Sequence, residues 1–197
     1  MGDKPRTAVL ASGTGRSLLN LLEQERAGAL PTETALVIGS KPGIKALDHA
    51  ARFDVSHEVL GPSAITAALD DAGIELVVMA GYLRRWPIPE RYVGKTINIH
   101  PSLLPLFGGK GMYGHHVHEA VIASGMRVSG CTVHFVTENY DEGPIIGQRT
   151  VPVAWDDDAD SLADRVFQQE CILLPESVAA VATGRIRLVD GQARHEG

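Results

Sequence analysis

Short apolar runs alternate with amphipathic segments along the first half of the chain. The apolar runs occupy residues 7–11, 35–38 and 74–79, and residues 55–59 are interpreted as a further short strand. Helical patterns begin near residue 18 and then cover 44–52 and 63–72. Strands that alternate with helices at this spacing form a parallel sheet with right-handed crossovers. We therefore predict an α/β fold, a three-layer, mostly parallel twisted sheet of Rossmann-like type with helices on both faces.

The second half predicts fewer and longer elements. Strand patterns cover 95–100, 129–136 and 145–153, and helical patterns cover 117–124 and the stretch from the acidic start at 156–160 to Gly184. Pro175 interrupts the last helix, and we expect a kink about one turn after Glu170 because proline lacks a backbone N–H. Residues 186–189 are predicted as a final edge strand and 190–197 as a frayed polar tail.

Composition narrows the class of protein. A chain of 197 residues with 44% hydrophobic content predicts one domain. Its net charge of −6 argues against a nucleic-acid partner, which would need a clustered basic face. Cys131 and Cys171 are predicted to be buried thiols of a reducing compartment. With neither a signal-peptide pattern nor a membrane-length apolar run, we expect a cytoplasmic protein without a membrane partner.

A glycine turn follows the first predicted strand. Residues 12–17 read Ser-Gly-Thr-Gly-Arg-Ser and lead directly into a helix. The free N–H groups and the positive dipole end of such a helix suit a phosphate. Glycines that merely permit positive φ in a βα turn explain the pattern equally well. The spacing matches neither the dinucleotide fingerprint nor a Walker loop, so no nucleotide cofactor is implied.

The candidate chemistry lies on two strands and the loop after one of them. Alternation along 95–100 places Thr96, Asn98 and His100 on one face. Asp141 lies between the strands 129–136 and 145–153. An amide, an imidazole and a carboxylate are suited to acid/base chemistry at a carbonyl. Turn composition alone would also explain Asp141.

A glycine-rich segment follows this strand and leads to three histidines. We interpret residues 103–114 as a long loop that covers a site. His115, His116 and His118 raise the question of a metal, but side chains at i and i+2 of a helix diverge and neither a cysteine nor a paired carboxylate stands nearby. We predict no metal.

Three segments together resemble the folate-dependent formyltransferases. They are Asn98-Ile-His-Pro-Ser-Leu-Leu-Pro105, Gly130-Cys-Thr-Val-His-Phe-Val136 and Asp141-x-Gly-Pro-Ile-Ile146, and the similarity runs from about residue 7 to 188. The chain length and Ser12-Gly-Thr-Gly resemble the branch that acts on glycinamide ribonucleotide in purine synthesis. This resemblance implies direct transfer of a formyl group from the co-substrate 10-formyltetrahydrofolate to the amine of 5-phosphoribosylglycinamide, through a tetrahedral intermediate.

The resemblance also assigns roles to residues and regions. Within one domain over 1–197, about 1–95 would form the ribonucleotide side and about 96–190 the catalytic and folate side of a monomer or homodimer. Asn98, His100 and Asp141 would be catalytic, with Asp141 favouring the protonated imidazole of His100. The expected ligand contacts are Gly15, Arg16 and Ser17 to phosphate, Glu170 to ribose, and Leu83, Arg84, Arg85, Trp86, Asn98, Thr137, Glu138, Asn139, Tyr140 and Asp141 to the pteridine, with Thr132 and His134 behind them. The histidines at 115, 116 and 118 would serve the loop or the folate tail.

The chain departs from the family pattern at three places. Arg85 stands where members usually have an apolar residue, and the loop 108–114 replaces a proline-glycine turn. Residues 61–63 lack a frequent arginine, which leaves ligand charge to Arg16, Lys41 or Arg84. These departures leave the three catalytic positions unchanged.

Two alternative functions remain open. A formyltetrahydrofolate hydrolase would use the same three residues with water in place of the amine, although such hydrolases usually carry an amino-terminal regulatory domain for which we expect no room before residue 7. A non-catalytic nucleotide-binding α/β module would explain the glycine turn but not the three polar positions.

Overall fold

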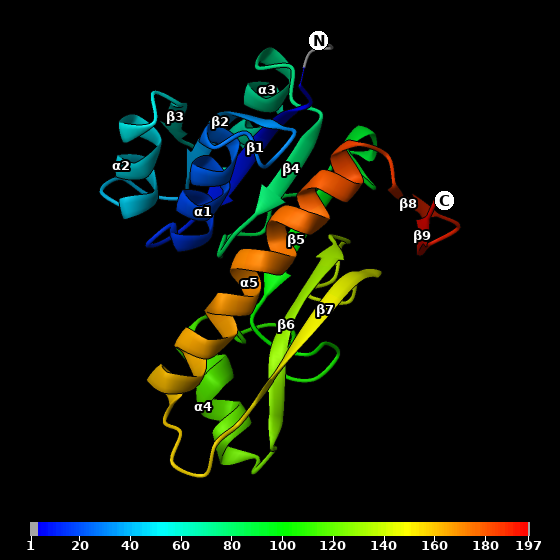
Figure 1. The fold of residues 1–197 in the computed structure, drawn as a ribbon. Coiled ribbons are helices and arrows are strands. Elements are labelled where there is room, and N and C mark those ends of the chain that lie inside the picture. Colours follow the sequence, from blue (N-terminus) through cyan, green and yellow to red (C-terminus); the bar gives the residue numbers. More distant parts are fainter. Residues whose placement is uncertain (1–3, 197) are drawn as a thin grey trace.

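The computed structural model describes residues 4–196, which form a seven-stranded sheet flanked by helices (Figure 1). The strand order is β3-β2-β1-β4-β5-β6-β7. The strands are β1 (Arg6–Ala11), β2 (Glu33–Gly39), β3 (Ser56–Val59), β4 (Leu76–Met79), β5 (Thr96–His100), β6 (Val128–Phe135) and β7 (Ile145–Pro152). The first five strands are parallel, and β6 and β7 are antiparallel to their neighbours. The predicted α/β class is confirmed.

Helices cover the two faces of the sheet unequally. They are α1 (Arg16–Arg26), α2 (Lys45–Arg52), α3 (Pro62–Asp71), α4 (His115–Ala123) and α5 (Ala159–Ala182), with a short 3-10 helix at Glu90–Tyr92. Buried residues of α1, α2, α4 and α5 share one core with alternate strand residues such as Val9 and Val78. The intervening strand residues, such as Leu10 and Val77, pack against α3 and Trp86. The period-2 alternation of each strand therefore serves two cores.

On strands β5 and β6, the face of the sheet on the same side as α3 carries polar residues. Asn98 is paired with His134 and His100 with Thr132 across these two antiparallel strands. Their neighbours Ile97, Ile99, Cys131 and Val133 point into the opposite core. Because directly opposed side chains lie on the same face, this register brings the four polar groups together.

Pro175 lies inside an uninterrupted α5, so the predicted interruption is wrong. Proline cannot donate to the carbonyl of Cys171, four residues earlier. That oxygen instead accepts hydrogen bonds from the side-chain amides of Asn20, at 3.0 Å, and Gln24, at 3.3 Å, both on α1. Side chains of a neighbouring helix thus replace the missing backbone donor, and α1 and α5 are tied together at this point.

The carboxyl end also differs from prediction. Residues Ile186–Val189 form β8, which pairs with β9 (Gln192–His195) in a separate hairpin beside the large sheet (Figure 1). Asp190 and Gly191 adopt positive φ at its turn, a conformation that two-residue hairpin turns require. The segment predicted as a frayed tail is therefore ordered from 190 to 196, and Gly197 lies outside the described residues.

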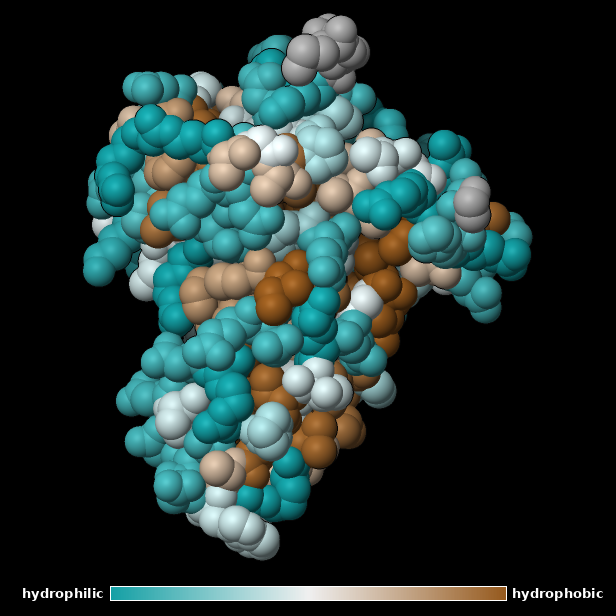
Figure 2. All heavy atoms as spheres, in the orientation of Figure 1, coloured by the Kyte–Doolittle hydropathy of each residue, from teal (hydrophilic) through white to brown (hydrophobic). Residues whose placement is uncertain are grey.

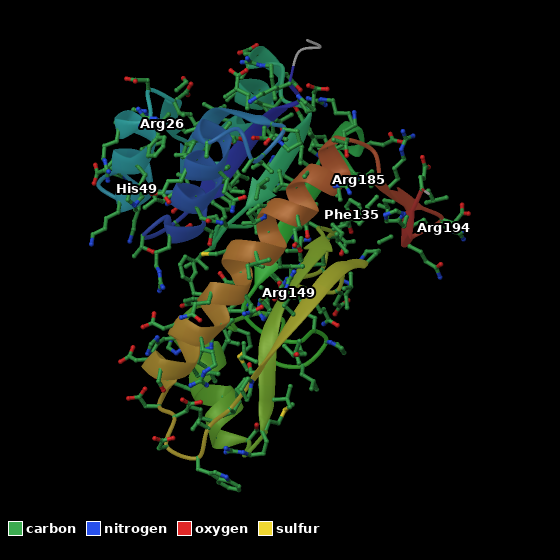
Figure 3. All side chains as sticks on the ribbon, viewed as in Figure 1. Arg26, His49, Phe135, Arg149, Arg185 and Arg194 are labelled. Carbon is green, nitrogen blue, oxygen red and sulfur yellow. The ribbon has the colours of Figure 1, made fainter. Side chains whose placement is uncertain are left out.

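The face of the molecule drawn in Figure 2 is largely hydrophilic, with hydrophobic residues visible along α5 and β7. On the same side Arg149 of β7 lies beside α5 (Figure 3), where its Nη2 donates to both carboxylate oxygens of Glu176. No helix within residues 4–196 is both long and apolar enough to cross a membrane.

The contact between α1 and α5 predicts a coupled effect on stability. Asn20→Ala should lower the free energy of unfolding by about 1 kcal/mol, because the Cys171 carbonyl loses its shorter hydrogen bond. In a Pro175→Ala background, where position 175 can donate to that carbonyl, the same change should cost less than half as much. Urea unfolding of the four proteins measures both values. Glu23→Ala, at an exposed α1 position, is the control, and equal costs in the two backgrounds would contradict this explanation.

Candidate active site

Two cavities meet above the polar face of β5 and β6. One, of about 260 Å³, is lined by the segment after β4 and by residues 136–141. The other, of about 360 Å³, lies between residues 81–83, the end of β5 and the glycine-rich loop. Tyr82, Asn98, Tyr140 and Asp141 line both cavities. Ligands in the two cavities would therefore meet at Asn98 and Asp141.

The orientation of Asn98 is set by a histidine on the neighbouring strand. Its Nδ2 lies 3.2 Å from His134 Nε2, and His134 Nδ1 lies 2.8 Å from the carbonyl oxygen of Phe135. A carbonyl only accepts, so Nδ1 donates to it, and Nε2 is the nitrogen that accepts from the Asn98 amide. An amide NH₂ has two hydrogens. One holds the side chain in place, which leaves the other for a ligand.

His100 is fixed in a similar way by the loop that follows it. Its Nε2 lies 2.8 Å from the carbonyl oxygen of Phe107 and donates to it. Its Nδ1 faces Asp141 Oδ2 at 3.6 Å, and the side chain is only 4% exposed. The nitrogen that can gain or lose a proton is thus the one that faces the carboxylate.

The carboxylate of Asp141 lies between two imidazoles. Oδ1 is 3.6 Å from His134 Nε2, Oδ2 is 3.6 Å from His100 Nδ1, and Oδ2 also accepts from the backbone N–H of Gly109 at 2.9 Å. Although burial raises the pKa of Asp141, the two imidazoles and the backbone N–H of Gly109 together outweigh burial and leave the pKa below its usual value. Asp141 is therefore ionised near neutral pH.

Asp141 favours the protonated form of His100, as its negative charge leads one to expect, but it does not decide the net shift of the pKa. Burial lowers the pKa of His100 by more than the Asp141 carboxylate raises it, so the pKa lies below its ordinary value. The carboxylate acts in the predicted direction, but desolvation of a nearly buried ring is the larger effect. His100 is accordingly neutral near pH 7 in the absence of ligand.

Nearly all residues expected around a pteridine line the smaller cavity. Arg84, Arg85, Trp86, Asn98 and the five residues from Thr137 to Asp141 are among its walls. Leu83 is the exception, because it lines the second cavity. Trp86 is 4% exposed, and its indole N–H donates to Thr66 of α3. Arg85 reaches across to the carbonyl oxygen of Glu138 at 3.4 Å.

The residues expected around phosphate and ribose lie outside both cavities. Gly15 has φ of 69°, and a Cβ there would lie 2.7 Å from the Cα of Ala46, so backbone conformation and packing both require glycine. No side chain caps α1, which leaves its first N–H groups without a side-chain partner. Arg16 stacks on Phe167 with its guanidinium carbon 3.7 Å from the ring centroid and pairs with Asp164, so its side chain is already engaged.

Glu170 is a partly buried carboxyl of α5 near Arg16. Burial raises its pKa to about 7, and the charge of Arg16 opposes that shift only partly. Glu170 therefore changes protonation state close to physiological pH. An accepting or donating contact to a sugar hydroxyl is chemically possible for its two forms.

Backbone groups and glycines of the site were not identified from the sequence. Gly109 supplies the N–H to Asp141, and Phe107 supplies the carbonyl to His100. Gly143 has no space for a side chain, since a Cβ there would lie 1.7 Å from the carbonyl oxygen of Phe135. The glycine at 143, two residues after Asp141, was the one signal in the sequence for close packing at this point. No signal in the sequence indicated the backbone contacts of Gly109 and Phe107.

Thr132 supports the start of the loop over the site. Its hydroxyl donates to the Ser102 carbonyl at 2.6 Å and accepts from the backbone N–H of Leu104 and from Gln148. Thr132 lines neither cavity, whereas His134 borders the smaller one.

The three histidines of α4 have separate surroundings. His115 and His116 approach Asp160 and Glu119 respectively, and His118 is buried, which lowers its pKa to about 4. Among residues 4–196, no three histidine, cysteine or acidic side chains gather in a way that could hold a metal ion.

The fold and the site define an α/β protein that places an amide, an imidazole and a carboxylate at the carboxyl end of a parallel strand, the usual ligand-binding edge of such sheets. The family model described as formyl transferase matches residues 5–178. The chain therefore belongs to the formyl transferase family.

Named relatives narrow the comparison. The chain is 37% identical over 195 residues to the chloroplastic phosphoribosylglycinamide formyltransferase of Vigna unguiculata, covering 93% of this chain and 62% of the relative. It is 36% identical to the human trifunctional purine biosynthetic protein adenosine-3, covering 94% of this chain but 19% of that protein. It thus spans from about a fifth to under two thirds of the length of these curated relatives. A crystal structure of glycinamide ribonucleotide transformylase 1 from Symbiobacterium toebii matches with a TM-score of 0.91 and 33% identity, covering 100% of this chain and 96% of that one.

The contacts of His100 predict its titration. Its pKa should lie below the ordinary value near 6.5, and Asp141→Asn should lower it further, because the carboxylate that favours the imidazolium is lost. Imidazole chemical shifts followed by NMR against pH measure both. The control is Asp160→Asn, which changes an exposed carboxylate beside His115 and should leave His100 unchanged. An unchanged or higher pKa in Asp141→Asn would show that burial alone governs the ring.

The raised pKa of Glu170 predicts that replacing this residue with glutamine stabilises the protein in a pH-dependent way. Since its pKa is raised to about 7 in the folded state, the folded protein binds the proton more tightly than the unfolded chain, and stability falls as pH rises from about 4.5 through 7. Glu170→Gln mimics the protonated form and should raise the free energy of unfolding by about 2 kcal/mol at pH 8 but little at pH 5. Urea unfolding at the two pH values is the measurement. A variant equally stable to the wild type at pH 8 would contradict the raised pKa.

Proposed function

We propose that this chain transfers the formyl group of 10-formyltetrahydrofolate to the amine of 5-phosphoribosylglycinamide. The observation that carries the proposal is that Asn98 and Asp141 line both cavities, and that His100 lines the second cavity and faces Asp141. Family membership supports formyl transfer, and the names of relatives similar over most of this chain support the acceptor. Two cavities that share a polar wall suit a reaction between two bound substrates.

Asn98 stabilises the oxyanion in this proposal. Attack of the amine on the formyl carbon gives a tetrahedral carbon whose oxygen becomes negatively charged. The Asn98 N–H that is not held by His134 donates to this oxygen. Because His134 fixes the amide before the substrate arrives, little reorganisation accompanies the reaction.

His100 and Asp141 move the proton. The amine must lose a proton as its bond to carbon forms, and the folate nitrogen must gain one as the old bond breaks. Nδ1 of His100 and the Asp141 carboxylate face each other at 3.6 Å, and a water held beside them relays the proton between the two nitrogens. A neutral His100 accepts this proton and returns it, and the ionised Asp141 stabilises the transient imidazolium.

The ligands occupy separate regions. The pteridine enters the smaller cavity beside Trp86 and residues 137–141, which present backbone groups to its polar edge. The phosphate binds the uncapped N-terminus of α1 at Gly15, Arg16 and Ser17 through backbone N–H groups, since the Arg16 guanidinium is engaged with Asp164 and Phe167. Glu170 binds the ribose hydroxyls. We propose the cytoplasm as the compartment, in keeping with two free cysteines, and a monomer or homodimer as the assembly.

Asp141→Asn tests the proposal directly. The change removes the negative charge while keeping the shape of the side chain, so turnover with both substrates should fall by about 10²-fold or more. The initial rate of formylated ribonucleotide production measures the effect, with unfolding midpoints to verify the fold. Asp71→Asn, which alters an exposed carboxylate at the end of α3, is the control and should retain nearly full turnover. A folded Asp141→Asn protein with full activity would refute the assigned role.

A further inference from the structure

The glycine-rich loop places one lysine over the second cavity in a defined conformation. The backbone N–H of Met112 donates to the carbonyl of Gly109 at 3.0 Å, closing a four-residue turn with Lys110 and Gly111 at its centre. Gly111 has φ of 91°, as the third position of a type II turn requires. Lys110 therefore stands at the tip of a turn whose backbone conformation depends on glycine.

This turn is fastened to the catalytic groups on one side. Gly109 donates its N–H to Asp141 Oδ2, and two residues earlier the Phe107 carbonyl accepts from His100. Lys110 is thus the residue directly after Gly109, whose backbone N–H is hydrogen-bonded to Asp141. Lys110 lines the same cavity as His100 and Asp141.

The ammonium group of Lys110 is not paired with a carboxylate among the described residues. Three histidine, lysine or acidic side chains line this cavity: His100, Lys110 and Asp141. The Asp141 carboxylate already contacts two imidazoles and a backbone N–H. Within residues 4–196, Lys110 makes no ion pair with any carboxylate, although the chain carries 24 acidic and 18 basic residues. A cation that borders a cavity and lacks an internal partner is available to an anionic ligand.

We propose that Lys110 binds an oxyanion of a substrate that enters this cavity and so contributes to substrate specificity. The inference rests on the proposed function, whose substrates offer two sources of this chemistry. One is the glutamate carboxylates of the folate, and the other is the phosphate of the ribonucleotide, which would then lie in this cavity instead of at the α1 N-terminus. A lysine ammonium donates to either as a mobile point charge. The two sources make different predictions for binding.

Calorimetric titration separates the two sources without depending on turnover. The ligands are 5-phosphoribosylglycinamide, the matching glycinamide riboside without phosphate, and tetrahydrofolate with one or with three glutamates. Lys110→Gln should weaken binding by about tenfold for one source. If the source is phosphate, the ribonucleotide is weakened and the riboside is not. If it is carboxylate, tetrahydrofolate is weakened, and more so with three glutamates.

Two further variants and a control distinguish charge from shape. Lys110→Arg keeps the charge and should bind within about twofold of the wild type. Gly111→Ala forces a side chain into a φ of 91° and should weaken binding as Lys110→Gln does, because the turn that presents the lysine is strained. Lys95→Gln removes an exposed lysine that lines neither cavity and should change no Kd.

These experiments test the role of Lys110 separately from the proposed formyl transfer. A Lys110→Gln protein with unchanged Kd for every ligand, or a Lys110→Arg protein as weak as Lys110→Gln, would overturn the role of the charge even if the wild type is an active transferase. A wild type that binds the ligands with the expected Lys110 dependence but forms no product would leave this role standing and refute the proposed reaction. A wild type that binds none of them would overturn both.

Discussion

The site depends on a carboxylate held almost out of water between two imidazoles. Asp141 is 13% exposed at its side chain, yet its pKa is lowered because His100, His134 and the Gly109 N–H surround it. An ionised group in such a place must be paired, since an unpaired buried charge is very costly. The β5–β6 register supplies the histidines, and the loop over the site supplies the N–H. The ionised Asp141 therefore depends both on the pairing of β5 with β6 and on the position of the loop that contains Gly109.

The same arrangement sets the chemical state of each partner. His134 uses one nitrogen for a backbone carbonyl and the other for Asn98, so the amide is oriented before any ligand binds. His100 gives one nitrogen to the Phe107 carbonyl and keeps the other toward Asp141. Burial then makes His100 a weaker base than a free histidine. A neutral imidazole beside an ionised carboxylate can accept a proton at neutral pH and release it in the same reaction cycle.

The sequence predicted the parts of this account that rest on periodicity and residue type. Strand alternation placed Asn98 and His100 on one face, and the run of apolar segments predicted the sheet that carries them. The resemblance to a family, rather than composition, indicated the role of Asp141. Contacts made by backbone atoms could not be predicted, because no side-chain pattern encodes the Gly109 N–H or the Phe107 carbonyl. The continuity of α5 through Pro175 was missed for a related reason: its compensation comes from Asn20 and Gln24, about 150 residues away in the chain. The direction in which the pKa of His100 is shifted could not be predicted from the sequence either, because it depends on burial as well as on the charge of Asp141.

The central claim is direct transfer between two bound substrates, and following the formyl carbon tests it most directly. The wild-type protein would be supplied with 5-phosphoribosylglycinamide and with 10-formyltetrahydrofolate labelled with ¹³C at the formyl carbon. NMR and mass spectrometry would then follow the label. The account predicts that the ¹³C appears in the formamide of the ribonucleotide in a one-to-one ratio with the tetrahydrofolate released, with little free formate. Label found in formate, whether or not the ribonucleotide is present, would contradict it and identify water as the acceptor.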